Sequence, residues 1–214
     1  MTEKIKLGMR LIKYSFNLKQ NVALMVIFTI AGITWFSFSE MWQFGPLYLS
    51  IVGVYANQML NSLQYSGMVL SSPRKKELQL SVTSLVSLLY SVCFYALTIL
   101  VSVLDWKLFH QEGYSFRALV VFGSASMIMM IYEALWPKMG TIMVLMSIFV
   151  IFVPVWATMY SGSNLLEGIS LEAGLGIGLA GILLGAVLQY QVARLTYRLP
   201  VKYAPMLAAI QKYR

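Results

Sequence analysis

The residue types that most often perform catalysis or bind metal ions are scarce in this chain. It has one histidine, His110, one cysteine, Cys93, and eight acidic residues that are scattered along the sequence. Such a set offers no paired carboxylates, no metal cluster and no Cys/His pair. The chain also lacks a G-x-x-x-x-G-K-[ST] phosphate-binding loop and a G-x-S-x-G nucleophile motif. We therefore predict that the chain is not an enzyme and that it holds no metal or cofactor of its own.

Polar residues at helical spacing form two neighbouring stripes on one apolar segment. The first stripe consists of Asn57, Asn61 and Gln64, and the second consists of Tyr55, Gln58, Ser62 and Tyr65. Amides are costly to bury in lipid, so this segment should face protein or a water-filled path. Two interpretations stay open: these residues line a substrate path, or they satisfy one another in the core of a helical bundle.

Small residues recur at helical spacing on two later segments. They allow helix backbones to approach closely, and a serine hydroxyl can bond back to its own helix. We predict that both sets serve helix packing, and for the glycines we favour contact within the chain over a dimer interface. The sets are Ser84, Ser87 and Ser91, and the two G-x-x-x-G pairs Gly174 with Gly178 and Gly181 with Gly185.

One acidic residue, Glu133, falls inside a predicted membrane span rather than in an outer loop. It lies close to Lys138 in the sequence, near the expected cytoplasmic end of that span. An interfacial ion pair between the two is expected in preference to a proton relay, because the other acid within the stated spans, Glu172, lies at the outer end of the last one.

The elements that must position these residues are membrane helices, as the composition indicates. Of 214 residues, 59% are hydrophobic and only 11% are charged, and the mean hydropathy is +0.73. We predict an all-α integral membrane protein with a single transmembrane domain over residues 1–214. Six segments are apolar over the length that a bilayer requires: Val22 to Phe38, Leu47 to Leu70, Leu78 to Leu104, Ala118 to Leu135, Met139 to Tyr160 and Leu171 to Tyr190.

The basic residues indicate the orientation of these spans. With six spans, all of the 16 basic residues except Lys107 and Arg117 fall on one side, and the positive-inside rule makes that side cytoplasmic. Both termini are then inside, with an amphipathic interfacial helix over residues 1–20, a six-helix bundle over 22–190 and a basic tail over 191–214. A simple topology signal is the alternative for residues 1–20. The net charge of +8 is thus explained by topology, without a nucleic-acid partner.

A short basic turn separates the second and third predicted spans. Ser72 can cap a helix and Pro73 suits the first helical position, and the cations Arg74, Lys75 and Lys76 follow. Another protein could bind such a turn, although taken alone it is more often a topology signal.

This pattern resembles the small membrane subunits of type-2 ATP-binding cassette exporters. An amphipathic elbow helix, here Lys4 to Gln20, six spans with both termini inside, and a small-Pro-basic turn carry the resemblance. Compact bacterial permeases that export antimicrobial or cytolytic peptides, such as the phenol-soluble modulin exporters, are the most similar. The resemblance implies a multi-pass protein of the bacterial cytoplasmic membrane and a separate ATPase subunit that binds ATP and Mg. It also implies a second permease subunit, identical or related, and coupling to the ATPase through Ser72, Pro73, Arg74, Lys75, Lys76 and Glu77.

The resemblance therefore implies a permease that exports amphipathic peptides or other hydrophobic substrates by alternating access. Two other functions stay open. A six-span substrate-binding subunit of a vitamin importer would also need a separate ATPase, and a membrane immunity or assembly protein would need none.

Overall fold

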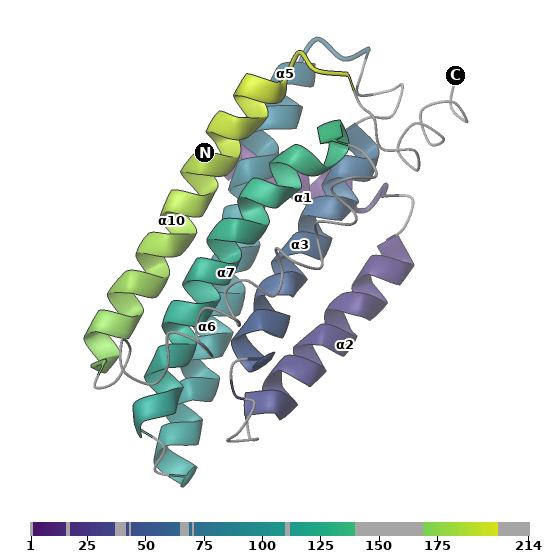
Figure 1. Ribbon diagram of the computed structural model, residues 1–214. Coiled ribbons are helices and arrows are strands. Elements are labelled where there is room, and N and C mark those ends of the chain that lie inside the picture. Colours follow the sequence, from purple (N-terminus) through teal and green to yellow (C-terminus); the bar gives the residue numbers. More distant parts are fainter. Residues whose placement is uncertain are drawn as a thin grey trace.

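The chain folds into a bundle of long helices that run side by side (Figure 1). The computed structural model describes residues 2–15, 18–36, 42, 44–64, 69, 71–109, 112–139 and 169–200. Within these residues every regular element is a helix, which confirms the predicted all-α class for this part of the chain. The elements are α1 (Thr2–Ile12), α2 (Leu18–Phe36), α3 (Phe44–Gln64), α5 (Lys75–Glu77), the π-helical η2 (Leu78–Val82), α6 (Thr83–Phe109), α7 (Glu112–Met139) and α10 (Leu171–Thr196).

Four of the described helical segments are long and apolar enough to cross a membrane. They are Leu18–Phe36, Lys75–Leu108, Phe116–Met139 and Leu171–Thr196. The predicted second span corresponds to α3, which has 21 residues but carries several amides and is not among the four. The predicted fifth span, Met139 to Tyr160, lies outside the described residues except for Met139 itself. Among the described residues the structure therefore provides four helices that are long and apolar enough to span a membrane, whereas the count of six and the orientation stay predictions.

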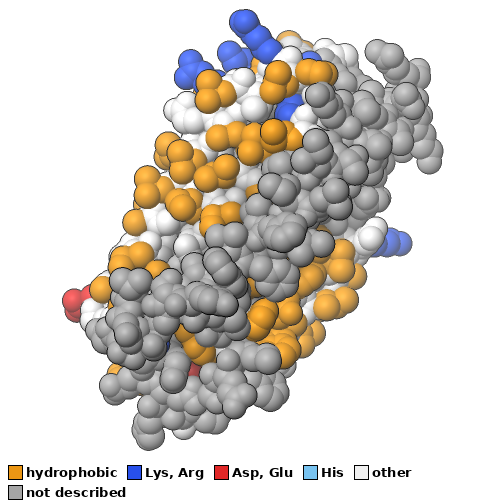
Figure 2. Space-filling view, in the orientation of Figure 1, with side chains coloured by type: hydrophobic (Ala, Val, Ile, Leu, Met, Phe, Trp, Pro, Cys, Tyr) orange, Lys and Arg blue, Asp and Glu red, His pale blue; other side chains and the backbone are white. Residues whose placement is uncertain are grey.

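The outer surface of the bundle is apolar where α2 and α10 face outward. Large side chains of both helices are exposed, among them Val26 and Ile30 on α2 and Leu184 and Val187 on α10. Figure 2 shows apolar side chains over much of the visible described surface, with Lys and Arg gathered at one end. Continuous exposed apolar surface of this kind suits contact with lipid tails rather than with water.

Helix α3 lies at the centre of the bundle, in contact with α2, α6 and α7. Its residues Leu49, Val52 and Met59 are almost completely buried. Helix α10 packs on α7 and α6 from the outside. The helix begins where Ser170 caps it, because the Ser170 Oγ accepts a hydrogen bond from Ala173 N at 3.2 Å.

Helix α1 lies across the bundle near the end where α5 begins (Figure 1). Gly8 and Ile12 are buried against the bundle, whereas Lys6, Arg10 and Lys13 are exposed. A Cβ atom at Gly8 would stand only 2.5 Å from the Val86 Cγ2 atom, so the absence of a side chain permits this close crossing. An amphipathic helix is thus present in the region where the sequence predicted one, over Thr2–Ile12.

Candidate functional site

A buried polar cluster connects α3, α6, α7 and α10 in the interior of the bundle. Its most polar member is Glu133 on α7, which is 3% exposed. Asn61 on α3 donates a hydrogen bond from Nδ2 to Glu133 Oε2 at 3.1 Å. A carboxyl group inside a membrane bundle is costly unless it is paired or neutralised, and such groups usually have a function.

The expected ion pair between Glu133 and Lys138 is wrong. Lys138 instead donates from Nζ to the Leu199 backbone oxygen at 2.8 Å, while Glu133 faces α3. Residues five positions apart lie about 140° apart around a helix, so the two side chains leave α7 on different faces. Closeness in the sequence therefore misidentified the partner of Glu133.

Several buried oxygens of the cluster have no hydrogen-bond partner within the described residues. They include Glu133 Oε1, Asn57 Oδ1 and Ser126 Oγ. All three residues line one small cavity of about 10 Å³, together with Ser50, Ser87 and Ser91. A second cavity of about 20 Å³ is bordered by Asn57, Asn61, Gln79, Thr83, Ser84, Glu133 and Gln189, among others. Each cavity has room for about one water molecule, and polar walls favour its presence.

The predicted path residues on α3 separate into two groups. Asn57 and Asn61 are buried beside Glu133. Tyr55 faces α2 instead, where its ring stacks on Phe28 with centroids 5.5 Å apart, and Gln58 is half-buried. The Gln64 side chain and Tyr65 lie outside the described residues. The structure thus brings Asn57 and Asn61 to the polar cluster, with the Gln58 side chain also within hydrogen-bonding reach of Glu133, and it places Tyr55 elsewhere.

The three α6 serines predicted to serve packing are all buried. Ser84 donates from Oγ to its own helix at the Leu80 oxygen, 3.1 Å away. Ser87 accepts a hydrogen bond from Gln189 Nε2 of α10 at 3.2 Å, and Ser91 faces Gly53 of α3. These serines also line the two polar cavities, so they belong to the cluster as well as to the helix contacts.

The predicted glycine pairs lie on the side of α10 that packs against α7. A Cβ atom would stand 2.9 Å from the Phe116 oxygen at Gly174 and 2.6 Å from the Leu119 oxygen at Gly178. At Gly181 it would meet the Gly123 backbone at 2.8 Å, and at Gly185 the Met127 Cα at 2.8 Å. The successive partners show that α7 and α10 run parallel at backbone contact distance. The Tyr95 hydroxyl of α6 completes this contact by donating to the Leu175 oxygen at 3.0 Å.

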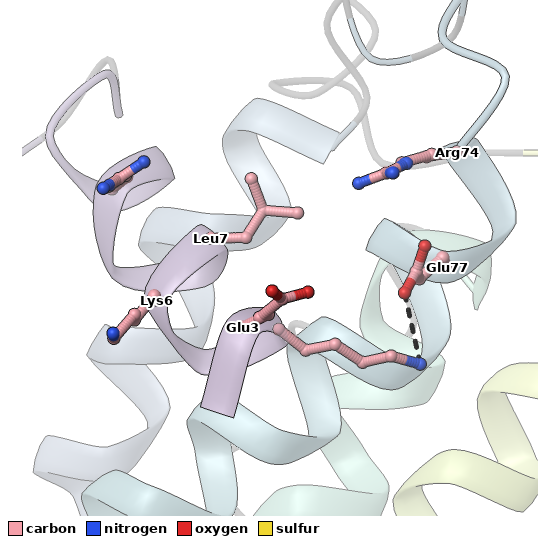
Figure 3. Close-up of a pocket in the computed structure, with 7 residues that line it drawn as sticks. Glu3, Lys6, Leu7, Arg74 and Glu77 are labelled. Carbon is pink, nitrogen blue, oxygen red and sulfur yellow. Dashed lines mark ion pairs between the residues drawn. The ribbon is translucent and has the colours of Figure 1, made fainter. Parts of the chain in front are cut away.

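The basic turn lies beside α1 at one end of the bundle. Helix α5 begins at Lys75, and Arg74 is the residue that precedes it. Ser72 is therefore not the N-cap residue, and Pro73 is not the first helical residue, contrary to the prediction. Ser72 Oγ accepts from Arg74 N at 3.2 Å, and it therefore stabilises the turn that precedes the helix. Lys4 Nζ of α1 pairs with Glu77 Oε1 at 3.2 Å, as the dashed line in Figure 3 shows.

Sequence reasoning did not identify Glu133 as the centre of the polar cluster, and it did not include Gln189 or Ser126 in the site. The available signal was their polarity within otherwise apolar helices, and it would have marked Gln189 as a residue that faces protein. Together the cluster offers hydrogen-bonding groups and one carboxyl group inside a lipid-facing bundle. Among the described residues, no group of three His, Cys, Asp or Glu side chains is placed to hold a metal ion.

The interpretation of this site rests on its own residues. Comparisons of the chain with protein-family models, with curated proteins and with solved structures found no match.

Proposed function

We propose that the protein is the transmembrane permease subunit of an ATP-binding cassette transporter, driven by a separate ATPase subunit that binds ATP and Mg. The observation that carries this proposal is one continuous helical run. Helices α5, η2 and α6 follow one another without a break from Lys75 to Phe109. This run begins at the exposed basic turn and then passes the polar cavities at Ser84, Ser87 and Ser91. A force applied at the turn would therefore reach the buried cluster through a single rigid element.

The proposal includes six spans with both termini on the cytoplasmic side. Helices α7 and α10 run parallel, because Gly174 lies near Phe116 and Gly185 near Met127. The described end of α7 and the described start of α10 therefore lie at opposite ends of the bundle, and their positions support one further crossing between them. Helix α3, at about 1.5 Å per residue, is long enough to be another span, and its amides face protein rather than lipid.

The proposed ATPase contact is the surface formed by α1 and the basic turn. Arg74 and Lys76 are exposed there, and Lys75 is half-buried. The Lys4–Glu77 ion pair and the close packing of Gly8 on Val82 and Val86 join α1 to the start of the α5–η2–α6 run. An acidic groove on the ATPase would complement the three cations, and movement of the turn would move α1 with it.

The proposed substrates are amphipathic peptides or other hydrophobic molecules that are exported by alternating access. In this conformation the cavities beside Asn57, Asn61 and Glu133 each hold about one water molecule, so a larger substrate requires the helices to separate. A second permease subunit, identical or related, would provide the other wall of the path. A vitamin-binding subunit would instead need a preformed ligand pocket, and the water-sized interior cavities give that alternative no support.

Co-expression with a candidate ATP-binding cassette ATPase from the same organism tests the coupling surface. Charge reversal of Arg74, Lys75 and Lys76 to glutamate should abolish co-purification or substrate-stimulated ATP hydrolysis. The double variant K13E/K19E is the matched control, because it reverses exposed cations outside the turn. If the triple variant assembles and hydrolyses ATP like the unmodified chain, the assignment of the turn is wrong.

Replacement of Asn57 and Asn61 by leucine tests the polar path separately. Export of the substrate should fall while assembly with the ATPase persists, because neither residue touches the basic turn. The control T29L/T34L removes two hydroxyls of α2 that bond only to their own helix. Unchanged export in N57L/N61L would mean that the amides only hold the bundle together.

A further inference from the structure

A charged cleft lies between α1 and the start of α5. It encloses about 720 Å³ and is lined by Glu3, Lys4, Lys6, Leu7, Arg10, Arg74 and Glu77. Figure 3 shows Arg74 pointing from the turn toward α1, with the Glu3 carboxylate between the two elements and Lys6 on the outer side of α1. The cleft is open to solvent, and its wall on α1 contains the single apolar side chain Leu7.

The charges of the cleft do not cancel. Lys4 and Glu77 neutralise each other as an ion pair at 3.2 Å. Lys6, Arg10 and Arg74 then stand against one carboxylate, that of Glu3. The remaining excess is positive, and two of the three cations are guanidinium groups, which bind phosphate oxygens with paired hydrogen bonds.

The surroundings of α1 indicate at which level of the bilayer this cleft lies. Gly8 of α1 crosses η2 at Val82 and α6 at Val86. On one side of this crossing, toward the turn, lies the charged cleft with Arg74 and Glu77. On the other side lies an apolar groove of about 360 Å³, which is lined by Ile12, Val22, Met25, Val26, Thr29, Ile30, Met59, Tyr90 and Phe94.

The lining residues thus change from charged to apolar within a few helical turns along the α5–η2–α6 run. This order matches that of the headgroup and acyl-chain layers in a bilayer leaflet. Helix α1 therefore lies where lipid headgroups meet acyl chains, as amphipathic interfacial helices do. A solvent-open cleft at that level of the membrane surface would meet lipid phosphates at a far higher local concentration than phosphates from the cytosol.

We propose that the cleft between α1 and α5 binds the phosphate headgroup of an anionic phospholipid in the adjoining leaflet. Arg10 and Arg74 hold the phosphate from opposite walls, and Lys6 adds attraction at the outer edge. Basic pockets at membrane surfaces select anionic lipid in this way. The bound headgroup bridges α1 and the basic turn, so it stabilises their contact independently of any ATPase. The inference depends on the membrane setting of α1 and not on the transport function.

The test uses the purified full chain in detergent, titrated with phosphatidylglycerol and, separately, with phosphatidylcholine, with bound lipid counted by native mass spectrometry. Phosphatidylglycerol should bind saturably and more tightly. Each of the variants R10Q and R74Q should weaken its binding about fivefold, as expected for removal of one cation near a lipid surface. Equal binding of both lipids, or unchanged affinity in R10Q/R74Q, would overturn the proposal.

Matched controls separate the cleft from general electrostatic attraction. K13Q just after α1 and K76Q on α5 remove cations of the same region that do not line the cleft. Each should change the affinity by less than about twofold because solvent screens distant charges. E3Q should strengthen binding, since it removes the one unpaired carboxylate. A loss of affinity in K13Q or K76Q as large as in R10Q would contradict a defined site.

A further arm distinguishes a lipid from a free phosphate. Glycerol phosphate, added as a competitor, should displace phosphatidylglycerol only weakly, because it lacks the acyl chains that hold the headgroup at this depth. If glycerol phosphate binds the chain as tightly as the lipid does, the cleft is a site for soluble phosphate compounds and the lipid assignment fails.

Discussion

Helix α7 contacts its neighbours through two surfaces that are built on opposite principles. Toward α10 the contact consists of glycines and backbone atoms, with Gly123 packed on Gly178 and Gly181. Toward α3 and α6 the contact consists of polar side chains around Glu133 and Asn61, and it includes two water-sized cavities. The first surface is packed at backbone contact distance, whereas the second keeps spare volume and buried oxygens that lack a partner within the described residues.

This difference indicates which surface holds the bundle together and which one can change. Backbone contacts between membrane helices gain their stability from close van der Waals packing and tolerate no added atom. A polar interior with unpartnered groups is less stable in any single arrangement, because those groups can find other partners when the helices shift. We expect α7 and α10 to move as one unit against α3 and α6.

The largest effect that would test this comparison is expected at Gly178. A Cβ atom there would stand 2.6 Å from the Leu119 oxygen and would collide with the Tyr95 hydroxyl, so G178A must separate α7 from α10. We expect G178A to lower the free energy of unfolding by about 3 kcal/mol, measured by denaturation in mixed detergent micelles.

The control for this variant is Gly176, two positions away on the same helix. No atom lies within 4 Å of a Cβ placed there, so G176A should gain up to about 1 kcal/mol from improved helix propensity. Similar stability of G178A and G176A would mean that the glycine contact does not hold the two helices.

The next effect concerns Glu133 on the polar side of α7. E133A removes the acceptor of Asn61 Nδ2 and leaves that buried amide unpaired in a larger cavity. The expected loss is about 2 kcal/mol in the same assay. E133Q keeps the shape and one acceptor oxygen, so it should cost less than half as much. If E133A is as stable as E133Q, the side chain of Glu133 does not stabilise the contact between α3 and α7.

A smaller effect compares two buried serines of the polar cluster. S87A leaves Gln189 Nε2 without its acceptor and should cost about 1 kcal/mol. S126A removes a hydroxyl that has no partner within the described residues, so its effect on stability should be near zero or slightly favourable. Equal losses in the two variants would show that Ser126 Oγ is satisfied through a water in its cavity.

The smallest effect is expected outside the bundle interior, at the Lys4–Glu77 ion pair. The side chains of Lys4 and Glu77 are 41% and 35% exposed, so solvent screens their attraction. A double-mutant cycle with K4Q and E77Q should give a coupling energy of no more than about 0.5 kcal/mol. A much larger coupling would place this pair, rather than the Gly8 crossing, at the centre of the contact between α1 and the α5–η2–α6 run.

The sequence predicted the helical class and much of the helix pattern, because hydropathy and helical periodicity are local properties. The basic turn and the amphipathic helix near the N-terminus were recognisable for the same reason. Helices extend beyond the predicted spans, as α10 does to Thr196, since hydropathy detects only the apolar part of a helix. The start of α5 at Lys75 was missed because Ser72 bonds within a turn rather than at the helix cap.

The sequence by itself determined that this chain builds apolar helices with a few polar residues that must avoid lipid. Only the tertiary structure decided which of those residues meet. Asn61 and Glu133 are 72 positions apart, and Ser87 and Gln189 are 102 positions apart. Such pairs depend on the rotation and register of whole helices, which backbone contacts like that of Gly123 with Gly178 set. Local periodicity identifies which residues share one face of a helix, but it contains no information about which residues of the neighbouring helix that face will contact.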